Sequence, residues 1–301
     1  MTTYPTVSVV IPLYNHERYI DATLDSVLAQ TVPPTEIIVV DDGSQDNSSQ
    51  RVAARAAQDP RIITWSHPNQ GAHYTINTAL LRSSSKYIAI LNSDDCYYPQ
   101  RIEACLQALE RDPGADAVCS ALTFLDDNGK PCRNKWYEES LAFYRQTNDL
   151  SLALINGNFL MTTSNLFIRR SVFNEVGYFA NLRYAHDLDF FLRLIVHGRK
   201  ITLLEQPLLH YRTHATNTIS EGVLKVKLEW AAVVAFFAWQ VGTERGWEYL
   251  DRLTEVTDRH NLTRLIFFFF KQFQQTPLSH ITVDSWLSND DFVKFMAGAV
   301  Q

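Results

Sequence analysis

The chain has 301 residues, of which 46% are hydrophobic and 20% are charged, and its formal net charge is −6. That length allows one large domain or two of modest size, and the negative charge argues against nucleic-acid binding through general basicity. The first residues lack the pattern of a signal peptide, and the longest apolar runs are well short of the ~20 residues that span a bilayer. We therefore expect a cytoplasmic protein without a transmembrane segment. The four cysteines form no C-x-x-C pair and fit a reducing compartment.

Buried strands alternate with amphipathic helices in the first third of the chain. Continuous β-branched runs are typical of strands that are buried on both faces of a sheet, and apolar residues at helical spacing indicate helices. The predicted strands are residues 7–11, 37–40, 61–65 and 87–91, and the predicted helices between them are residues 17–30, 46–57 and 72–82. This alternation predicts an α/β fold with a mostly parallel sheet that is flanked by helices.

The pattern is less regular after residue 100 and becomes helical near the C-terminus. Further strands are expected at residues 117–122, 165–168, 201–204 and 208–211. Residues 133–165 show weak periodicity, which predicts an irregular connection with one short helix near residues 147–156. From about residue 221 onward glycines are few and the spacing is helical. We therefore expect a sheet domain over residues 1–220 and a helical C-terminal subdomain over residues 221–301.

Two adjacent carboxylates, Asp94 and Asp95, follow the predicted strand at residues 87–91. Like charges at this distance repel, and each raises the pKa of the other. A divalent cation such as Mn²⁺ or Mg²⁺ removes the conflict, because these ions take oxygen ligands and often bridge carboxylates and substrate phosphates. On its own, a Ser-Asp-Asp sequence is equally typical of a solvated turn.

Three more polar segments follow predicted strands, so four such segments are expected at one edge of the sheet. They are Pro12-Leu13-Tyr14-Asn15, Asp41-Asp42-Gly43-Ser44 and Asn69-Gln70-Gly71, together with the Asp94-Asp95 pair. Their convergence favours a site for a phosphate-bearing ligand, which leaves a dinucleotide, a nucleotidyl-transfer or a sugar-nucleotide site. The first two are expected to have a glycine-rich loop after the first strand, but PLYNHE contains no glycine. A sugar-nucleotide site, in which a metal ion binds the diphosphate, fits the Asp pair.

Five segments, in this order and spacing, resemble family 2 inverting glycosyltransferases of the GT-A fold. They are VSVVIPLYN, EIIVVDDGSQDNS, NQG, YIAILNSDDCYYP and HDLDFFLRL, and the resemblance covers about residues 5–220. The resemblance implies a nucleotide-diphospho-sugar donor, with UDP as the expected nucleotide. It implies donor-binding roles for Pro12, Tyr14, Asp42, Asn69, Asn92, Asp94 and Arg212. It also implies that Asp187 is the catalytic base and that the ligands of Mn²⁺ or Mg²⁺ are Asp94, Asp95 and His214.

The resemblance also gives these residues specific tasks and shows two departures. Pro12 and Tyr14 match positions that line the base pocket, and Asp42 matches the carboxylate that hydrogen-bonds uracil. Asn92 stands where an Asp is common in the family, and His186 stands where a Glu usually precedes the base. An Asn can still bond a ribose hydroxyl but brings no charge, and a His changes the charge expected near the base.

The expected activity is metal-dependent sugar transfer, with inversion, to a hydroxyl of a glycan or lipid-linked acceptor in polysaccharide or glycoconjugate synthesis. One base deprotonates that hydroxyl, and the metal ion stabilises the departing diphosphate. Two alternatives stay open: a sugar-nucleotide-binding protein without turnover, and a nucleotidyltransferase. The apolar helical tail is expected to pack on the sheet domain, with a homodimer or peripheral contact with the inner face of a membrane as alternatives.

Overall fold

The computed structural model describes residues 5–215, 217 and 222–273. By its internal contacts the chain divides into two units, each built from separate stretches of sequence. The sheet unit consists of Met1–Asn134, Leu160–Phe179 and His197–Ala215, and the helical unit consists of Lys135–Phe159, Ala180–Val196 and Thr216–Gln301. The predicted boundary at residue 220 and the last part of the predicted tail, residues 274–301, lie outside the described residues.

All strands of the described residues lie in one sheet of the sheet unit, in the order β3-β2-β1-β4-β8-β6-β9-β5, with β7 paired to β6. The strands are β1 (Val7–Leu13), β2 (Glu36–Asp41), β3 (Ile62–Ser66), β4 (Tyr87–Ile90), β5 (Cys96–Tyr97), β6 (Ala117–Leu125), β7 (Pro131–Cys132), β8 (Phe167–Arg169) and β9 (Ile201–Arg212). The helices of this unit are α1 (Ile20–Leu28), α2 (Ser48–Ala56), α3 (Ala72–Arg82), α4 (Arg101–Arg111) and α7 (Phe173–Val176). The prediction of an α/β sheet flanked by helices is confirmed.

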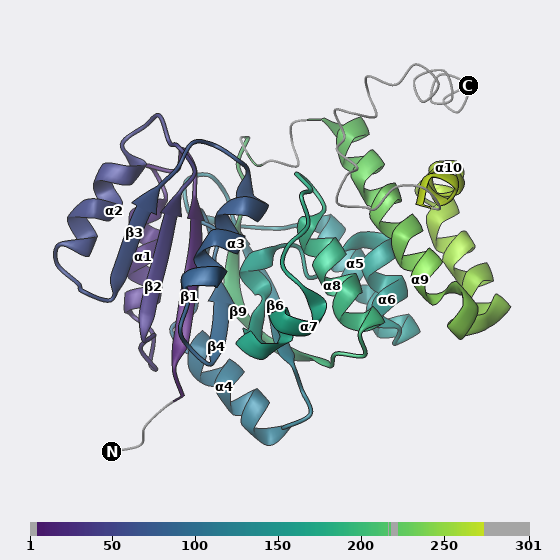
Figure 1. Cartoon of the computed structure of the whole chain (residues 1–301), viewed down its shortest axis with the longest axis horizontal. Helices are drawn as coiled ribbons and strands as arrows, with labels where there is room; N and C mark the ends of the chain where they lie inside the picture. Colours follow the sequence, from purple (N-terminus) through teal and green to yellow (C-terminus); the bar gives the residue numbers. More distant parts are fainter. Residues whose placement is uncertain (1–4, 216, 218–221, 274–301) are drawn as a thin grey trace. The chain divides into compact units, whose positions relative to one another are not determined.

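The order of the first four strands reverses in the middle of the sheet (Figure 1). The chain moves outward from β1 through β2 to β3 and then returns to form β4 on the other side of β1. Because crossovers between parallel strands are right-handed, this reversal puts α1 and α2 on one face of the sheet and α3 on the other. The central strands β1, β2 and β4 are almost fully buried, as their continuous apolar sequences predict, whereas β3 at the edge is half exposed.

The second half of the sheet is mixed rather than parallel. Strand β8 runs antiparallel to both β4 and β6, and β5 runs antiparallel to β9, while β6 and β9 are parallel. The two strands predicted at residues 201–211 form the single strand β9, with a register shift against β6 in the middle. Parallel pairing is therefore confined to β3-β2-β1-β4 and to the β6–β9 pair.

The helical unit contains α5 (Lys135–Thr147), α6 (Leu150–Gly157), α8 (His186–Val196), α9 (Val223–Asp258) and α10 (Thr263–Phe273). The short helix predicted near residues 147–156 is present as α6, but the prediction that the rest of residues 133–165 is irregular is wrong, because α5 occupies much of it. Helix α9 packs against α6, α8 and α10, and Gly246, with a φ of 75°, interrupts its helical geometry. No helix in the described part of the chain is both long and apolar enough to cross a membrane.

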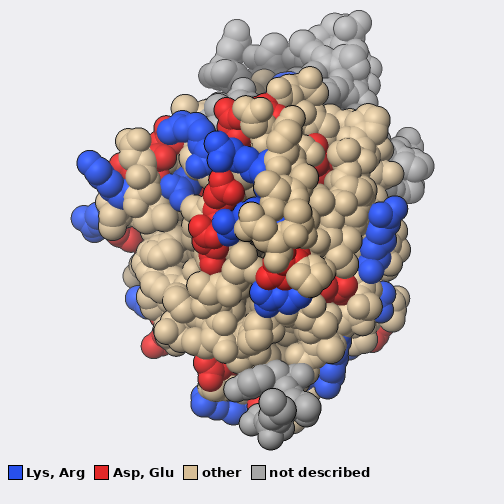
Figure 2. Space-filling model, turned by 90° about the vertical axis from the view of Figure 1, so that its left-hand side faces the viewer, with Lys and Arg blue, Asp and Glu red and all other residues tan. Residues whose placement is uncertain are grey.

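Ion pairs connect α1 and α2 on the outside of the sheet unit. Arg51 pairs with Asp21 and Arg55 pairs with Asp25, so each pair joins the two helices. Lys and Arg side chains lie among Asp and Glu side chains on the face shown in Figure 2. This face therefore has mixed charge, in keeping with the slightly acidic composition of the chain.

Candidate active site

The candidate site lies where the strand order reverses, beyond the carboxyl ends of β1 and β4. These two strands are parallel neighbours, but the connections that follow them lead in different directions. Open α/β sheets bind ligands at such a point, because the diverging connections leave room there. The loop after β1 carries His16, and the loop after β4 carries Asp94.

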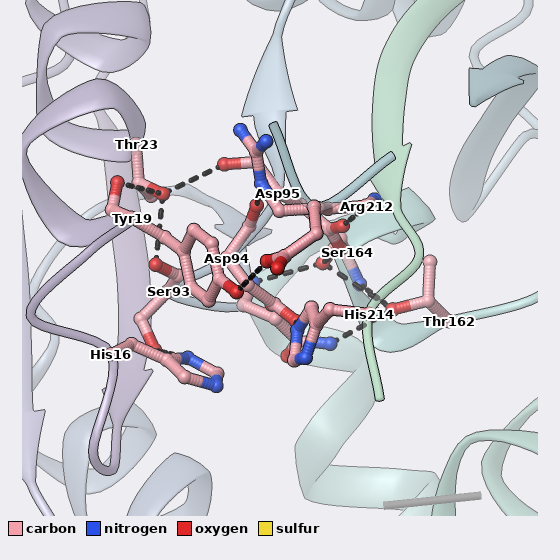
Figure 3. A network of polar contacts seen from close by, with 12 residues as sticks. His16, Tyr19, Thr23, Ser93, Asp94, Asp95, Thr162, Ser164, Arg212 and His214 are labelled. Carbon is pink, nitrogen blue, oxygen red and sulfur yellow. Dashed lines mark hydrogen bonds and ion pairs between the residues drawn. The ribbon is translucent and has the colours of Figure 1, made fainter. Parts of the chain in front are cut away.

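Three side chains at this point form a candidate metal site within the sheet unit (Figure 3). His16, Asp94 and His214 each offer one ligand atom, and these atoms lie within 4.8 Å of one another. The His214 Nε2 atom is 2.9 Å from the Asp94 Oδ2 atom, and Tyr19 stacks on the His214 ring with their centroids 4.9 Å apart. The predicted ligands Asp94 and His214 therefore lie together, and His16 joins them.

The short strand β5 brings His214 back to this point. It pairs with β9, so that Cys96 lies opposite His210. One residue before β5, the Asp95 Oδ1 atom accepts a hydrogen bond of 2.9 Å from the backbone N–H of Arg212. This pairing aligns the end of β9 with the carboxylate pair, and the chain continues directly to His214.

The protonation states of the cluster suit a divalent cation. Burial acts to raise the pKa of Asp94, but the hydrogen bond with His214 and the nearby His16 outweigh it, so the pKa lies below its usual value. Burial lowers the pKa of His16, which favours the neutral imidazole that metal ions bind. The Nδ1 atom of His16 is 2.8 Å from the Ser93 Oγ atom, and a hydrogen bond of this kind fixes the ring of a metal-binding histidine. One carboxylate and two imidazoles therefore fit the expected ion.

Asp95 is not part of this cluster. Its carboxylate is buried, its Oδ2 atom accepts a hydrogen bond of 2.6 Å from the Ser164 hydroxyl, and its Oδ1 atom accepts from the Arg212 backbone. Burial and the adjacent charge of Asp94 raise the pKa of Asp95 well above its usual value. The structure therefore separates the two predicted acidic ligands: Asp94 faces the histidines, and Asp95 holds the surrounding backbone in place.

Two predicted donor-binding residues have internal partners. The Asn92 amide donates to the Thr162 hydroxyl at 2.9 Å and accepts from the Thr163 hydroxyl at 3.1 Å. The Arg212 Nε atom donates to the backbone carbonyl of Asp94 at 2.8 Å, and its guanidinium group lies over the Tyr19 ring. Asn92 therefore bonds the hydroxyls of the 162–163 segment, and Arg212 supports the backbone at Asp94.

The other predicted donor-binding residues lie at the ends of β1, β2 and β3. Asp42 is buried, and its two carboxylate oxygens accept hydrogen bonds from the backbone N–H groups of Gln70 and Gly71, at 2.7 and 2.9 Å. Asn69 is exposed in the same loop, Tyr14 is 44% exposed and Pro12 is partly exposed. The structure thus brings the second and third polar segments into contact, with Asp42 as the connection between them.

Asp187, the predicted base, lies in the first turn of α8 in the helical unit. Its Oδ1 atom accepts a hydrogen bond of 2.8 Å from the Leu188 N–H, and its Oδ2 atom accepts one of 2.9 Å from the Asn158 amide. Burial outweighs these bonds and raises the pKa of Asp187 to about 6. Burial also lowers the pKa of His186 to about 4, so this departure from the family pattern adds no positive charge at neutral pH. Asp189 forms an ion pair with Arg193, in keeping with its interpretation as a structural residue.

His16 and the hydroxyl residues Thr162, Thr163 and Ser164 belong to the site but are not among the residues that the sequence motifs predict. A signal for His16 was present, since it follows the first strand in the same loop as Tyr14. The segment at residues 162–165, TTSN, is a short polar run in a weakly periodic region, and its partners lie some 70 positions away in the sequence. Local sequence patterns such as hydrophobic periodicity do not indicate contacts between residues so far apart.

Comparisons with known proteins identify the family of the chain. A sequence profile described as glycosyl transferase family 2 matches residues 8–177. An uncharacterized glycosyltransferase of Methanocaldococcus jannaschii is 28% identical over 233 residues, which are 74% of this chain and 76% of that protein. The chondroitin synthase of Pasteurella multocida is 32% identical over 197 residues, which are 65% of this chain but only 19% of the synthase.

Solved structures with the same fold include those of S. aureus TarS. The structure of TarS in complex with UDP-GlcNAc superposes with a TM-score of 0.65 and 16% identity, and the match covers 98% of this chain and 79% of that one. A complex of TarS with UDP gives a TM-score of 0.62 and 18% identity, and covers 85% of this chain and 71% of that one. At these identities the likeness concerns the fold. Together with the profile match, it shows that the chain is a glycosyltransferase of the GT-A fold and belongs to glycosyl transferase family 2.

Proposed function

We propose that the protein transfers a sugar from a UDP-sugar to a hydroxyl acceptor, with inversion at the anomeric carbon, and that a divalent cation bound by His16, Asp94 and His214 is required. The observation that carries this proposal is the cluster of these three residues at the point where the strand order reverses. The TarS complexes with UDP and UDP-GlcNAc support the choice of donor, because that protein shares the fold.

Of the two expected ions, Mn²⁺ fits the donor set better than Mg²⁺ does. Imidazole nitrogen suits transition metals, whereas Mg²⁺ prefers oxygen ligands and keeps several waters. The set of two nitrogens and one oxygen therefore favours Mn²⁺ over Mg²⁺. When bound, the ion offsets the negative charge of the diphosphate leaving group.

The residues of the chain supply the other functions. We propose that Asp187 takes the proton of the acceptor hydroxyl, which requires an ionised carboxylate with a pKa close to the working pH. A single displacement that is assisted in this way inverts the anomeric carbon. Asp42 is proposed to accept a hydrogen bond from the imide N–H of uracil, using carboxylate lone pairs that the Gln70 and Gly71 N–H groups do not occupy. Pro12, Tyr14 and Asn69 are proposed to bind the donor beside it.

Roles for Asn92 and Arg212 in donor binding stay predictions, and so do ligation by Asp95, a glycan or lipid-linked acceptor, a cytoplasmic location and a homodimer. Family membership favours the transferase over the nucleotidyltransferase and over a binding protein without turnover.

Calorimetry tests the metal requirement. We expect UDP to bind more tightly with Mn²⁺ than with EDTA, and the Asp94→Asn variant to lose most of that difference. Asp112→Asn is a matched control, because Asp112 lies on the surface and pairs with Lys200. Equal UDP affinity with Mn²⁺ and with EDTA would overturn the proposed metal site. A product with the anomeric configuration of the donor, measured by nuclear magnetic resonance, would overturn inversion.

A further inference from the structure

A buried carboxylate of α9 binds the backbone directly before α8, within the helical unit. The Glu229 Oε1 atom accepts a hydrogen bond of 2.8 Å from the Arg183 N–H. Its Oε2 atom accepts from the N–H groups of Tyr184, at 2.6 Å, and of Ala185, at 3.0 Å. Glu229 is only 4% exposed. Three consecutive backbone donors therefore point at one side chain that is far away in the sequence.

The position of these donors relates them to the proposed base. Helix α8 begins at His186, immediately after Ala185, and Asp187 is its second residue. The N–H groups at the start of a helix have no partner inside the helix, and a negative charge there also interacts favourably with the helix dipole. Glu229 thus fixes the segment from which Asp187 extends.

Trp230, the residue after Glu229 on α9, contacts the end of α6, the second segment that supports Asp187. The Trp230 Nε1 atom donates a hydrogen bond of 3.1 Å to the backbone carbonyl of Ile155 in α6. Asn158, which follows the last residue of α6, donates to the Asp187 carboxylate. Glu229 therefore holds the segment before α8, and Trp230 holds the end of α6. The Asp187 carboxylate lies between these two segments.

We infer that Glu229 is a positioning residue for acceptor activation, and that α9 belongs to the catalytic framework. The inference rests on the proposed function, because it requires Asp187 to be the base. A carboxylate that must meet an acceptor hydroxyl tolerates little displacement, since a shift of ~1 Å can cost about 100-fold in rate. Holding three backbone donors at once restricts such displacement more than a single contact would.

The first part of the test measures the contact itself. In Glu229→Gln, one carboxylate oxygen becomes an NH₂ group that cannot accept hydrogen bonds from the backbone. Hydrogen–deuterium exchange of the full chain should show faster exchange of the amides at residues 183–185, while Glu248→Gln, at an exposed position of the same helix, should leave it unchanged. Unchanged exchange in Glu229→Gln would overturn the inference whatever the activity does.

The second part measures the effect on transfer. We expect kcat of Glu229→Gln to fall by about 10- to 100-fold, with UDP affinity within a factor of two of the wild type. In the Asp187→Asn background the same change should have little further effect, because residues that act through one another are not additive. A merely structural residue would lower kcat equally in both backgrounds. Wild-type kcat in Glu229→Gln, or full additivity with Asp187→Asn, would overturn the positioning role.

A second variant keeps the inference testable if Glu229→Gln does not fold. Glu229→Asp keeps the buried charge but is one methylene shorter, so it cannot reach all three donors. We expect it to fold and to show a smaller loss of kcat than Glu229→Gln, and a wild-type kcat in a variant with faster exchange would contradict the inference. Failure of the proposed function gives a different result, in which Asp187→Asn alone retains turnover.

Discussion

At the scale of single residues, Asp187 combines burial with few compensating contacts. Its carboxylate accepts hydrogen bonds from the Leu188 N–H and the Asn158 amide, yet burial raises its pKa to about 6. A carboxyl group with this pKa is largely ionised at neutral pH and is a stronger base than an ordinary aspartate. Its neighbour Asp189 is also buried and burial raises its pKa too, but its carboxylate forms an ion pair with Arg193.

Replacing Asp187 with Asn should remove the base and leave donor binding intact. Asn is nearly isosteric but cannot take up a proton at neutral pH. We expect kcat to fall by about 10²- to 10⁴-fold, the usual contribution of a positioned base, while UDP affinity with Mn²⁺ changes by no more than a factor of a few. Asp189→Asn serves as the comparison and should mainly lower stability. Retained turnover in Asp187→Asn would make Asp189 or His186 the next candidate.

The activity should also depend on pH in a defined direction. A base works in its ionised form, so a pKa of about 6 predicts that kcat/KM falls as the pH drops below about 6 and reaches a plateau above it. An unperturbed aspartate, with a pKa near 3.9, would show no such loss between pH 6 and pH 5. The profile should be measured at saturating Mn²⁺, so that protonation of the metal ligands does not contribute. A flat profile down to pH 5 would argue against Asp187.

His16 should contribute to metal binding as a third ligand. Removal of its imidazole in His16→Ala leaves Asp94 and His214 alone. We expect the Mn²⁺ concentration that gives half-maximal UDP binding to rise by at least ~10-fold, since the loss of even an outer contact to a metal ligand costs about that much. His197→Ala, at an exposed position of the sheet unit, is the control. An unchanged Mn²⁺ requirement would leave His16 with a supporting role.

At the scale of elements, the loops after β2 and β3 are packed tightly together. Gly43 has a φ of 76°, and a Cβ atom at this position would lie 3.1 Å from the Asn69 nitrogen and 3.2 Å from the His67 carbonyl oxygen. Asp42, the preceding residue, bonds the same loop through Gln70 and Gly71. The two loops are therefore joined by hydrogen bonds and close packing, and their geometry depends on the absence of a side chain at residue 43.

Gly43→Ala should therefore destabilise the protein and weaken UDP binding together. A side chain in the left-handed conformation costs about 1–2 kcal/mol, and the contact with the 67–71 loop adds to this. Gly198→Ala separates the cost of the left-handed conformation from the cost of the contact. Gly198 has a φ of 64°, but no atom lies within 4 Å of the added Cβ. Urea unfolding should show a larger loss for Gly43→Ala than for Gly198→Ala, and only the former should lower UDP affinity. Equal losses would mean that loop packing contributes nothing.

Most strands of the sheet were predictable from sequence, but the two-residue strands β5 and β7 and the antiparallel pairing of the second half were not. Continuous apolar runs identify β1, β2 and β4 because burial on both faces excludes polar residues from them. By contrast, β5 and β7 have two residues each and form because a partner strand is available, and no local pattern indicates that β8, predicted at residues 165–168, runs antiparallel to β4 and β6. Asp94 and His214 were expected together through a family resemblance, but the separation of Asp95 from Asp94 depends on contacts with Ser164 and Arg212 that no periodicity indicates.

At the scale of the whole molecule, the chain alternates between the two units instead of completing one before starting the other. The helical unit takes Lys135–Phe159 and Ala180–Val196 from within the predicted sheet domain. Composition and glycine content change near residue 221, which suggested a single boundary there, but α6 and α8 pack against α9, and α5 packs against α6, in spite of their sequence position. Packing between helices that are far apart in the sequence does not change the local amino-acid composition, so composition could not predict it.

The helical unit exposes large aromatic side chains, and we expect these to mediate association. Trp247 is 81% exposed, Phe267 is 65% exposed and Trp239 is 50% exposed. Sedimentation and flotation with anionic vesicles should show that the full chain dimerises or binds the vesicles, and that Trp247→Ser combined with Phe267→Ser abolishes the association. If the full chain is a monomer and does not bind vesicles, these side chains do not mediate association.

The residues at the end of β9 lie beside the loops that follow β1 and β4, and this has a consequence for synthesis on the ribosome. His16 and Asp94 are translated early, but the third ligand, His214, follows His16 by roughly 10–40 s at ~5–20 residues per second. During that interval the nascent chain can pair β1 with β4, yet it has neither His214 nor the Arg212 backbone that holds Asp95. A product that terminates before residue 214 would therefore lack the complete cation site even if its parallel strands had formed, and capture of the metal ion would distinguish finished chains from unfinished ones.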